Sequence, residues 1–362
     1  MTKFVLATDK IGTHCQQLTL SDPGRRSLLA AGVGGFAASL IGGVRPADAD
    51  TSPPLASGAL LQPAFGVLRQ VRAGGLNIGY VDAGPASGPA VVLLHGWPYD
   101  IHAYQDVVPI LAAAGFRVIV PYLRGFGTTH FVSDHTPRNG QQCVFAVDTV
   151  ALMDALGIGQ AVIGGFDWGA RTACIVAALW PERCRALVSV SGYLIGSQRA
   201  GEVPLSPQAE RAWWYQFYFS TERGRQGYDV NRDAFAQLIW QSASPDWAFD
   251  DATFGRSAQA LHNPDHVAIV IDNYRWRLGL TTGEPKYDHL EKQLEAAPII
   301  TVSTITLEGD ANGAPHPAPS AYAEKFSGQY THRTIAGGIG HNLPQEAPSA
   351  FAAAVMDVIR EA

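Results

Sequence analysis

One short segment constrains the fold of this chain more than any other. Ala161-Val162-Ile163 is apolar, residues 164–170 have the sequence Gly-Gly-Phe-Asp-Trp-Gly-Ala, and residues 171–179 follow a helical pattern. Small residues on both sides of Asp167 allow the backbone to turn sharply. The segment therefore predicts a strand, a tight turn and a helix, with Asp167 at the apex of the turn.

Strand and helix patterns alternate over most of the chain from about residue 65. Short, continuously apolar strands are typical of a parallel sheet buried on both faces, and the helices between them are expected to cover those faces. We predict strands at 76–81, 90–94, 117–120, 161–163, 186–190, 299–307 and 331–335, and helices at 104–114, 144–156, 170–180, 318–326 and 349–359. The fold class is therefore α/β, with a mostly parallel sheet.

The alternation stops between residues 193 and 285. This segment is rich in Trp, Tyr and Phe, and residues 213–219 and 267–280 have helical patterns. We therefore predict an inserted helical lid at 193–285, over an α/β core made of residues 65–192 and 286–362.

The N-terminal region has the features of an export signal followed by a linker. An Arg-Arg pair at 25–26 precedes an uncharged stretch at 27–44, and Ala-Asp-Ala at 47–49 is a small-residue cleavage site. We predict a twin-arginine signal peptide at 1–49, a linker at 50–64, and a periplasmic or secreted protein with no membrane contact after cleavage. The alternative is an uncleaved anchor, although the uncharged stretch is barely long enough to span a bilayer.

The composition excludes several kinds of partner. The chain of 362 residues is 47% hydrophobic and 16% charged, with a net charge of −6. It has no run of Lys or Arg that could follow a phosphate backbone, so we expect no nucleic-acid partner. His262 and His266 lie on either side of Pro264 without an evident third ligand, so we expect no metal. No glycine motif links a strand to a helix as a dinucleotide site requires, so we expect no cofactor.

Four motifs follow one another along the alternating pattern. They are His95-Gly96-Trp97-Pro98, Arg124-Gly125-Phe126-Gly127, the turn at Asp167, and Gly340-His341-Asn342. In this order they resemble the α/β-hydrolase superfamily, and within it the epoxide hydrolase and haloalkane dehalogenase branch. The resemblance covers residues 65–360. It implies an α/β-hydrolase fold with a helical lid, a small apolar substrate, and water as the second reactant.

An aspartate at the apex of the turn suits a particular chemistry. Asp167 is ionised at neutral pH, so it can attack an sp3 carbon without a base and form an ester. The resemblance implies that His341 activates the water that hydrolyses this ester, and that the backbone N–H groups of Trp97 and Trp168 form an oxyanion hole. The plainer alternative is that Asp167 only caps the following helix.

The acid that should orient His341 departs from the pattern of the resembling family. That family places it three residues after a glycine or alanine past the strand, and counting from Gly309 gives Asn312. The nearby acid is Asp310. We favour Asp310, because a carboxylate also stabilises the imidazolium; the alternative is a neutral hydrogen bond from Asn312.

Two lid tyrosines bear on the leaving group. Tyr215 and Tyr274 lie in segments similar to the two tyrosine motifs of epoxide hydrolases. Each phenol could donate to the epoxide oxygen before attack and protonate it afterwards. Tyr218 replaces Tyr215 if the register shifts by one turn, and the plainer alternative is that these rings only pack the lid.

We therefore predict a hydrolase that forms a covalent ester on Asp167 and opens epoxides to diols. One alternative is a haloalkane or haloacid dehalogenase with the same Asp167 and His341. The other is a non-catalytic binding protein on a hydrolase scaffold. The sequence predicts neither the exact substrate nor the oligomeric state.

Overall fold

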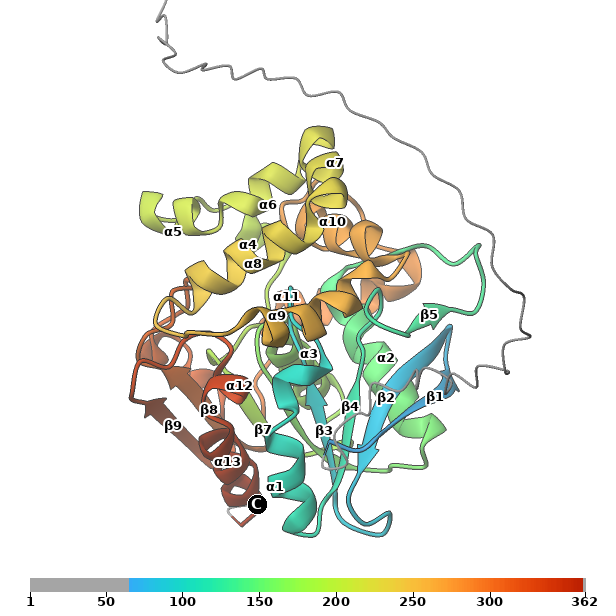
Figure 1. Cartoon of the computed structure of the whole chain (residues 1–362), viewed down its shortest axis with the longest axis vertical. Coiled ribbons are helices and arrows are strands. Elements are labelled where there is room, and N and C mark those ends of the chain that lie inside the picture. Colours follow the sequence, from blue (N-terminus) through green and yellow to red (C-terminus); the bar gives the residue numbers. More distant parts are fainter. Residues whose placement is uncertain (1–64, 361–362) are drawn as a thin grey trace, which may run out of the picture. The chain divides into compact units, whose positions relative to one another are not determined.

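The predicted sheet forms the centre of the molecule. The computed structural model describes residues 65–360, and the strands among them form one sheet in the order β1-β2-β4-β3-β6-β7-β8-β9, with β5 paired to β2 (Figure 1). The strands are β1 (Val67–Ala73), β2 (Leu76–Ala83), β3 (Ala90–Leu94), β4 (Arg117–Pro121), β5 (His130–Phe131), β6 (Ala161–Gly165), β7 (Cys184–Val190), β8 (Ser303–Gly309) and β9 (Tyr330–Ile335). The signal peptide predicted at 1–49 and the linker at 50–64 lie outside the described residues.

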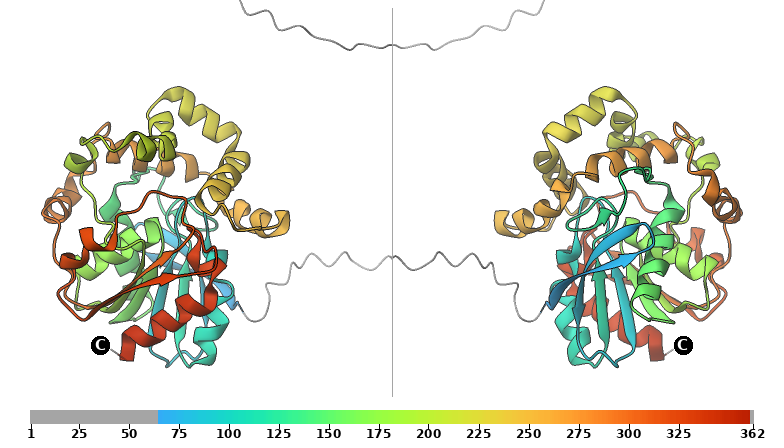
Figure 2. Two further views of the ribbon diagram at one scale, coloured as in Figure 1. Left: turned by 90° about the vertical axis from the view of Figure 1, so that its left-hand side faces the viewer. Right: turned by 90° about the vertical axis from the view of Figure 1, so that its right-hand side faces the viewer.

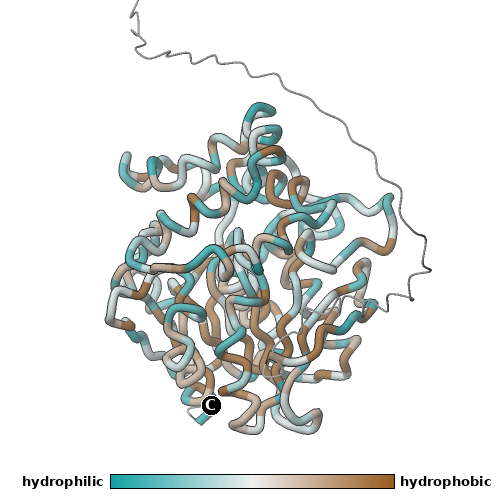
Figure 3. Tube along the Cα trace, viewed as in Figure 1, coloured by the Kyte–Doolittle hydropathy of each residue, from teal (hydrophilic) through white to brown (hydrophobic). Residues whose placement is uncertain are grey.

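The mostly parallel character of the sheet is confirmed. From β4 through β9 every pair of neighbouring strands is parallel, whereas β1, β2 and β5 form antiparallel pairs at one edge. The central strands β3 and β6 consist almost entirely of buried residues, as expected when helices cover both faces. Figure 3 shows that hydrophobic residues concentrate along these strands.

Helices cover both faces of the sheet (Figure 2). On one face α2 (Gln142–Ala155) packs against α3 (Trp168–Leu179), and α11 (Asp288–Glu295) also contacts α3. On the other face α1 (Val107–Ala113) packs against α13 (Pro348–Arg360), which follows the short α12 (Leu343–Glu346). Four of the five predicted core helices, those at 104–114, 144–156, 170–180 and 349–359, are therefore present with boundaries shifted by a few residues.

A helical segment separates β7 from β8 along the chain. It lies over the carboxyl ends of the central strands and is coloured yellow to orange in Figure 1. Its helices are α4 (Gln198–Gly201), α5 (Pro207–Ala212), α6 (Trp214–Phe219), α7 (Glu222–Val230), α8 (Arg232–Ala243), α9 (Asp251–Ala258) and α10 (His266–Arg277). We call this segment the lid.

One predicted element is wrong. Residues 318–326 do not form a single helix but two short 3-10 turns, Pro319–Ala321 and Ala323–Lys325. The backbone hydrogen bonds here join residues three apart, from the N–H of Tyr322 to Pro319 and from that of Phe326 to Ala323, and Tyr322 between the two turns has a non-helical φ of −133°. Within the described residues, no helix combines the length and apolar character needed to cross a bilayer.

Candidate active site

Asp167 occupies the turn between β6 and α3. Its φ and ψ angles are 52° and −122°, a region that residues other than glycine rarely adopt. The strand and helix pack closely here: a Cβ on Gly165 would meet the backbone of Gly169, and a Cβ on Gly169 would meet the carbonyl of Leu94. The glycines thus permit the tight turn that presents the Asp167 carboxylate. Its side chain does not cap α3, so the plainer alternative of a helix cap has no support.

Two neighbours keep the Asp167 carboxylate charged. Its Oδ1 accepts a hydrogen bond of 2.8 Å from the backbone N–H of Trp97, and its Oδ2 lies 3.6 Å from His341 Nε2. Burial alone would raise the pKa of Asp167, but His341 and the Trp97 N–H outweigh it, so the pKa is lowered. Asp167 is therefore an ionised carboxylate that can act as a nucleophile.

Trp97 and Trp168 lie on either side of Asp167. The Trp97 N–H already binds the carboxylate, and Trp168 is the first residue of α3, where a backbone N–H lacks an intrahelical acceptor. These are the two positions that an oxyanion hole would use.

His341 is held by its backbone rather than by an acid on its ring. Its N–H donates to the Ser244 hydroxyl (2.9 Å), and the Glu346 carboxylate accepts from the N–H groups of Gly340 and Asn342 on either side. Among residues 65–360, the buried Nδ1 of His341 has no hydrogen-bond partner. The ring is thus placed by its loop and by the neighbouring Tyr99 and Phe166 rings.

Neither candidate acid is joined to His341. The Asp310 carboxylate accepts hydrogen bonds of 2.9 Å from the backbone N–H groups of Gly337, Gly338 and Ile339. These bonds lower the pKa of Asp310. They also hold residues 337–339, which lead to His341, in place.

Asn312 likewise makes its contacts elsewhere. Its amide donates to Glu308 and Ser191, and its oxygen accepts from the N–H of Ala314. The structure therefore does not bring Asp310 or Asn312 to the ring of His341. Asp310 positions the loop of His341 instead.

Tyr215 and Tyr274 meet above Asp167. Tyr215 on α6 and Tyr274 on α10 have ring centroids 5.4 Å apart, and each lies 5.2 Å from the Trp97 ring. Burial raises the pKa of both phenols, so both remain proton donors. Tyr218 stacks on Phe235 instead, and the register with Tyr215 is therefore the one that faces the site.

A cavity of about 320 Å³ joins the core to the lid. Asp167 and His341 line it from the core, and Tyr215, Tyr274 and Arg277 line it from the lid. We call it the Asp167 cavity. Four of the five predicted catalytic side chains therefore share one cavity, and Asp310 is the exception.

A chain of buried hydrogen bonds fixes the Trp97 ring. Trp97 Nε1 donates to the Tyr228 hydroxyl (2.9 Å), and this hydroxyl lies 2.8 Å from His266 Nε2. His266 Nδ1 lies 2.9 Å from the Gly125 carbonyl, which can only accept, so Nδ1 carries the proton and Nε2 accepts from Tyr228. Burial lowers the pKa of His266 to about 3, which keeps the ring neutral.

This chain of bonds supports a stability prediction. Tyr228→Phe should lower the free energy of unfolding by about 2 kcal/mol, because it leaves a buried donor on Trp97 and a buried acceptor on His266 without partners. Urea unfolding measures the loss. Tyr218→Phe on α6 is the matched control and should cost much less; equal losses would contradict a role for the buried chain.

Several residues of the site were not found from the sequence. Arg171 lines the cavity one helical turn after Asp167, and Arg277 lines it three residues after Tyr274. Those spacings place them on the same helix faces, and this signal could have identified them. Tyr228 carried no such signal, because its partners Trp97 and His266 are distant in sequence. Within residues 65–360, no cluster of three or more His, Cys, Asp or Glu could hold a metal ion.

Comparisons with known proteins agree with this fold. The family model described as alpha/beta hydrolase fold matches residues 89–237. The crystal structure of a "putative epoxide hydrolase" from Klebsiella pneumoniae subsp. pneumoniae is 64% identical, covers 82% of this chain and 99% of its own, and superposes with a TM-score of 0.82.

Curated relatives show the same likeness over different spans. Epoxide hydrolase A of Mycobacterium tuberculosis is 26% identical over 319 residues, which cover 80% of this chain and 96% of that protein. Epoxide hydrolase B of the same organism is 33% identical over 150 residues, which span 38% of this chain and 41% of the relative. The chain belongs to the α/β-hydrolase family, and within it to the proteins that are similar to epoxide hydrolases.

Proposed function

We propose that this protein hydrolyses epoxides to diols through a covalent ester on Asp167. The observation that carries the proposal is the meeting of Asp167, His341, Tyr215 and Tyr274 in one cavity. The similarity to the two mycobacterial epoxide hydrolases supports it.

The first step forms the ester. An Asp167 oxygen attacks an epoxide carbon, the ring C–O bond breaks, and the alkoxide takes a proton from Tyr215 or Tyr274. The Trp97 N–H, which now binds Oδ1, remains on the oxygen that becomes the ester carbonyl.

The second step releases the diol. Water attacks the ester carbonyl while His341 Nε2 accepts a proton from it. The C–O bond to Asp167 breaks at the carbonyl carbon, and the leaving alkoxide takes the second proton of the attacking water, which leaves Asp167 as a carboxylate. The proton on His341 returns to the tyrosinate through water. Because no acid partners His341 Nδ1 among residues 65–360, the imidazolium is stabilised less than in a full triad, and ester hydrolysis should be the slow step.

A trapping experiment tests this proposal. Wild-type protein and His341→Gln are mixed with terminal epoxides, quenched in acid, and weighed intact by mass spectrometry. We expect His341→Gln to gain the mass of one whole epoxide, and the wild-type protein to show the same adduct transiently. Asp167→Asn is the control without a nucleophile. An adduct that persists in Asp167→Asn would contradict the proposal. The absence of both adduct and diol with every epoxide would also contradict it, and would favour a binding protein.

A dehalogenase is the second candidate, and the Trp97 indole argues against it. A halide site needs N–H donors that face the leaving group, but Trp97 Nε1 is already bonded to Tyr228. The same mass experiment with haloalkanes and haloacids separates the two, because a halide leaves and the adduct then lacks its mass.

A further inference from the structure

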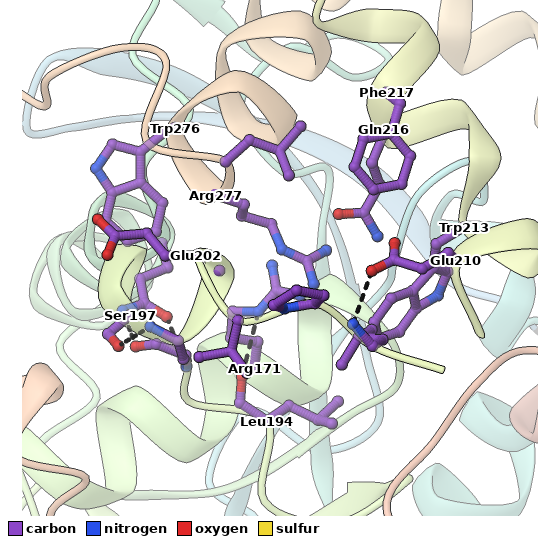
Figure 4. A pocket seen from close by; sticks show the side chains of 18 residues that line it. Arg171, Leu194, Ser197, Glu202, Glu210, Trp213, Gln216, Phe217, Trp276 and Arg277 are labelled. Atoms are coloured by element: carbon purple, nitrogen blue, oxygen red, sulfur yellow. Dashed lines mark hydrogen bonds between the residues drawn. The ribbon is translucent and has the colours of Figure 1, made fainter. Parts of the chain in front are cut away.

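Two arginines meet where the Asp167 cavity adjoins a second one. Arg171 comes from α3 in the core, and Arg277 ends α10 in the lid. Both line the Asp167 cavity and a neighbouring cavity of about 400 Å³ among the helices of the lid. Figure 4 shows their side chains reaching toward the same space.

Of the acidic side chains, Asp167 interacts with Arg171 through its charge but does not form an ion pair with it. Among residues 65–360, neither Arg171 nor Arg277 forms an ion pair. Arg171 Nε donates only to the Leu194 carbonyl, at 3.3 Å, and the Arg277 guanidinium lies over the rings of Trp213 and Tyr274, at 5.6 and 5.7 Å from their centroids.

Two other arginines of low exposure within residues 65–360 form ion pairs. Arg124 makes a bidentate contact with Asp148, and Arg138 binds Asp265 at 2.7 Å. A charge buried without a partner is costly, and two like charges repel more strongly inside a protein than in water. Burial and the nearby Arg277 lower the pKa of Arg171 to about 10, which still leaves it protonated at neutral pH.

The acidic residues of the region limit where an anion can bind. Glu202 and Glu210 line the second cavity, and Asp167 lines the first. An anion is therefore favoured at the boundary between the cavities, beside both guanidinium groups. Leu194 and Trp213, which also line both cavities, provide apolar walls there.

We propose that the substrate carries a carboxylate, which binds between Arg171 and Arg277 while its reactive carbon reaches Asp167. Planar guanidinium groups match a carboxylate with paired hydrogen bonds. A cavity of about 320 Å³ admits a small organic acid. This inference rests on the proposed epoxide hydrolysis for the identity of the reacting group, but the anion site itself can be tested without turnover.

The catalytic test compares an epoxide-bearing hexanoic acid with the carboxamide of the same skeleton. We expect the wild-type protein to prefer the acid, and Arg277→Gln to lower the ratio of the two kcat/KM values by about 30-fold or more. Arg277→Lys should retain part of the preference. Arg223→Gln removes an exposed arginine of α7 that lines neither cavity, and it should leave the ratio unchanged. An unchanged ratio in Arg277→Gln would overturn the inference.

The binding test uses hexanoate and hexanamide, which cannot react, and calorimetry. We expect hexanoate to bind the wild-type protein and not Arg277→Gln, and hexanamide to bind neither. If neutral epoxides are turned over but hexanoate does not bind, the anion site is wrong and the proposed function stands. If hexanoate binds and no epoxide reacts, the anion site stands and the proposed function fails.

Discussion

Replacing Asp167 by alanine should abolish diol formation, with a loss of at least about 10⁴-fold in kcat. In the proposed mechanism this carboxylate attacks carbon, and among residues 65–360 no second carboxylate lines the cavity to replace it. Initial rates with a panel of terminal epoxides, followed by chromatographic detection of the diol, measure the effect.

Two further variants separate chemistry from folding. Asp167→Asn should be equally inactive but keep the melting temperature, since asparagine tolerates the positive φ of 52° better than alanine does. Asp154→Ala, at an exposed position on α2, is the matched control and should retain full activity. Activity in Asp167→Ala within tenfold of the wild type would show that another group attacks the substrate.

Removing both phenols of the lid should have the second largest effect. Tyr215→Phe and Tyr274→Phe should each lower kcat for epoxides by about tenfold to 100-fold, and the double variant by about 10³-fold or more. One phenol can partly replace the other because their rings are 5.4 Å apart beside the same wall of the cavity. Steady-state kinetics across the four proteins gives the coupling between the two sites.

The control for this pair of tyrosines lies on α6, the helix that carries Tyr215. Tyr218→Phe changes a tyrosine of α6 that packs on Phe235 and does not line the Asp167 cavity, and it should change kcat by less than about threefold. If the double variant loses less than tenfold, the tyrosines do not protonate the leaving alkoxide. If the tyrosine variants lost halide release from haloalkanes as strongly as they lost diol formation from epoxides, the role of the tyrosines as proton donors would also be contradicted. A departing halide needs no proton.

The turn at Asp167 and the strands of the sheet were predictable from short stretches of sequence. The apolar runs at β3, β6 and β7 follow directly from burial on both faces, and the small residues around Asp167 follow from the close packing of β6 against α3. Tyr215 was also placed in its register from local resemblance alone. In each case the determining contacts lie within a few residues or repeat with a fixed period.

The partner of His341 was not predictable in the same way. Spacing along the loop after the strand leads to an acid, Asp310, and an amide, Asn312. The structure uses Asp310 to bind the backbone of Gly337 to Ile339, and Asn312 to bind Glu308. Which hydrogen bonds a carboxylate accepts depends on the path of another loop, and sequence spacing does not contain that path.

The sequence by itself determined the order of the strands along the chain, the sharp turn at Asp167 and the aromatic lid, because these depend on residue type and local period. Only the tertiary structure decided what faces Asp167. It brought Tyr215 and Tyr274 together from two helices, bonded Trp97 to Tyr228, and placed Arg171 beside Arg277 from segments far apart in the chain. A cavity is lined by side chains that packing brings together, and the free energy of that packing is not a property of any one segment.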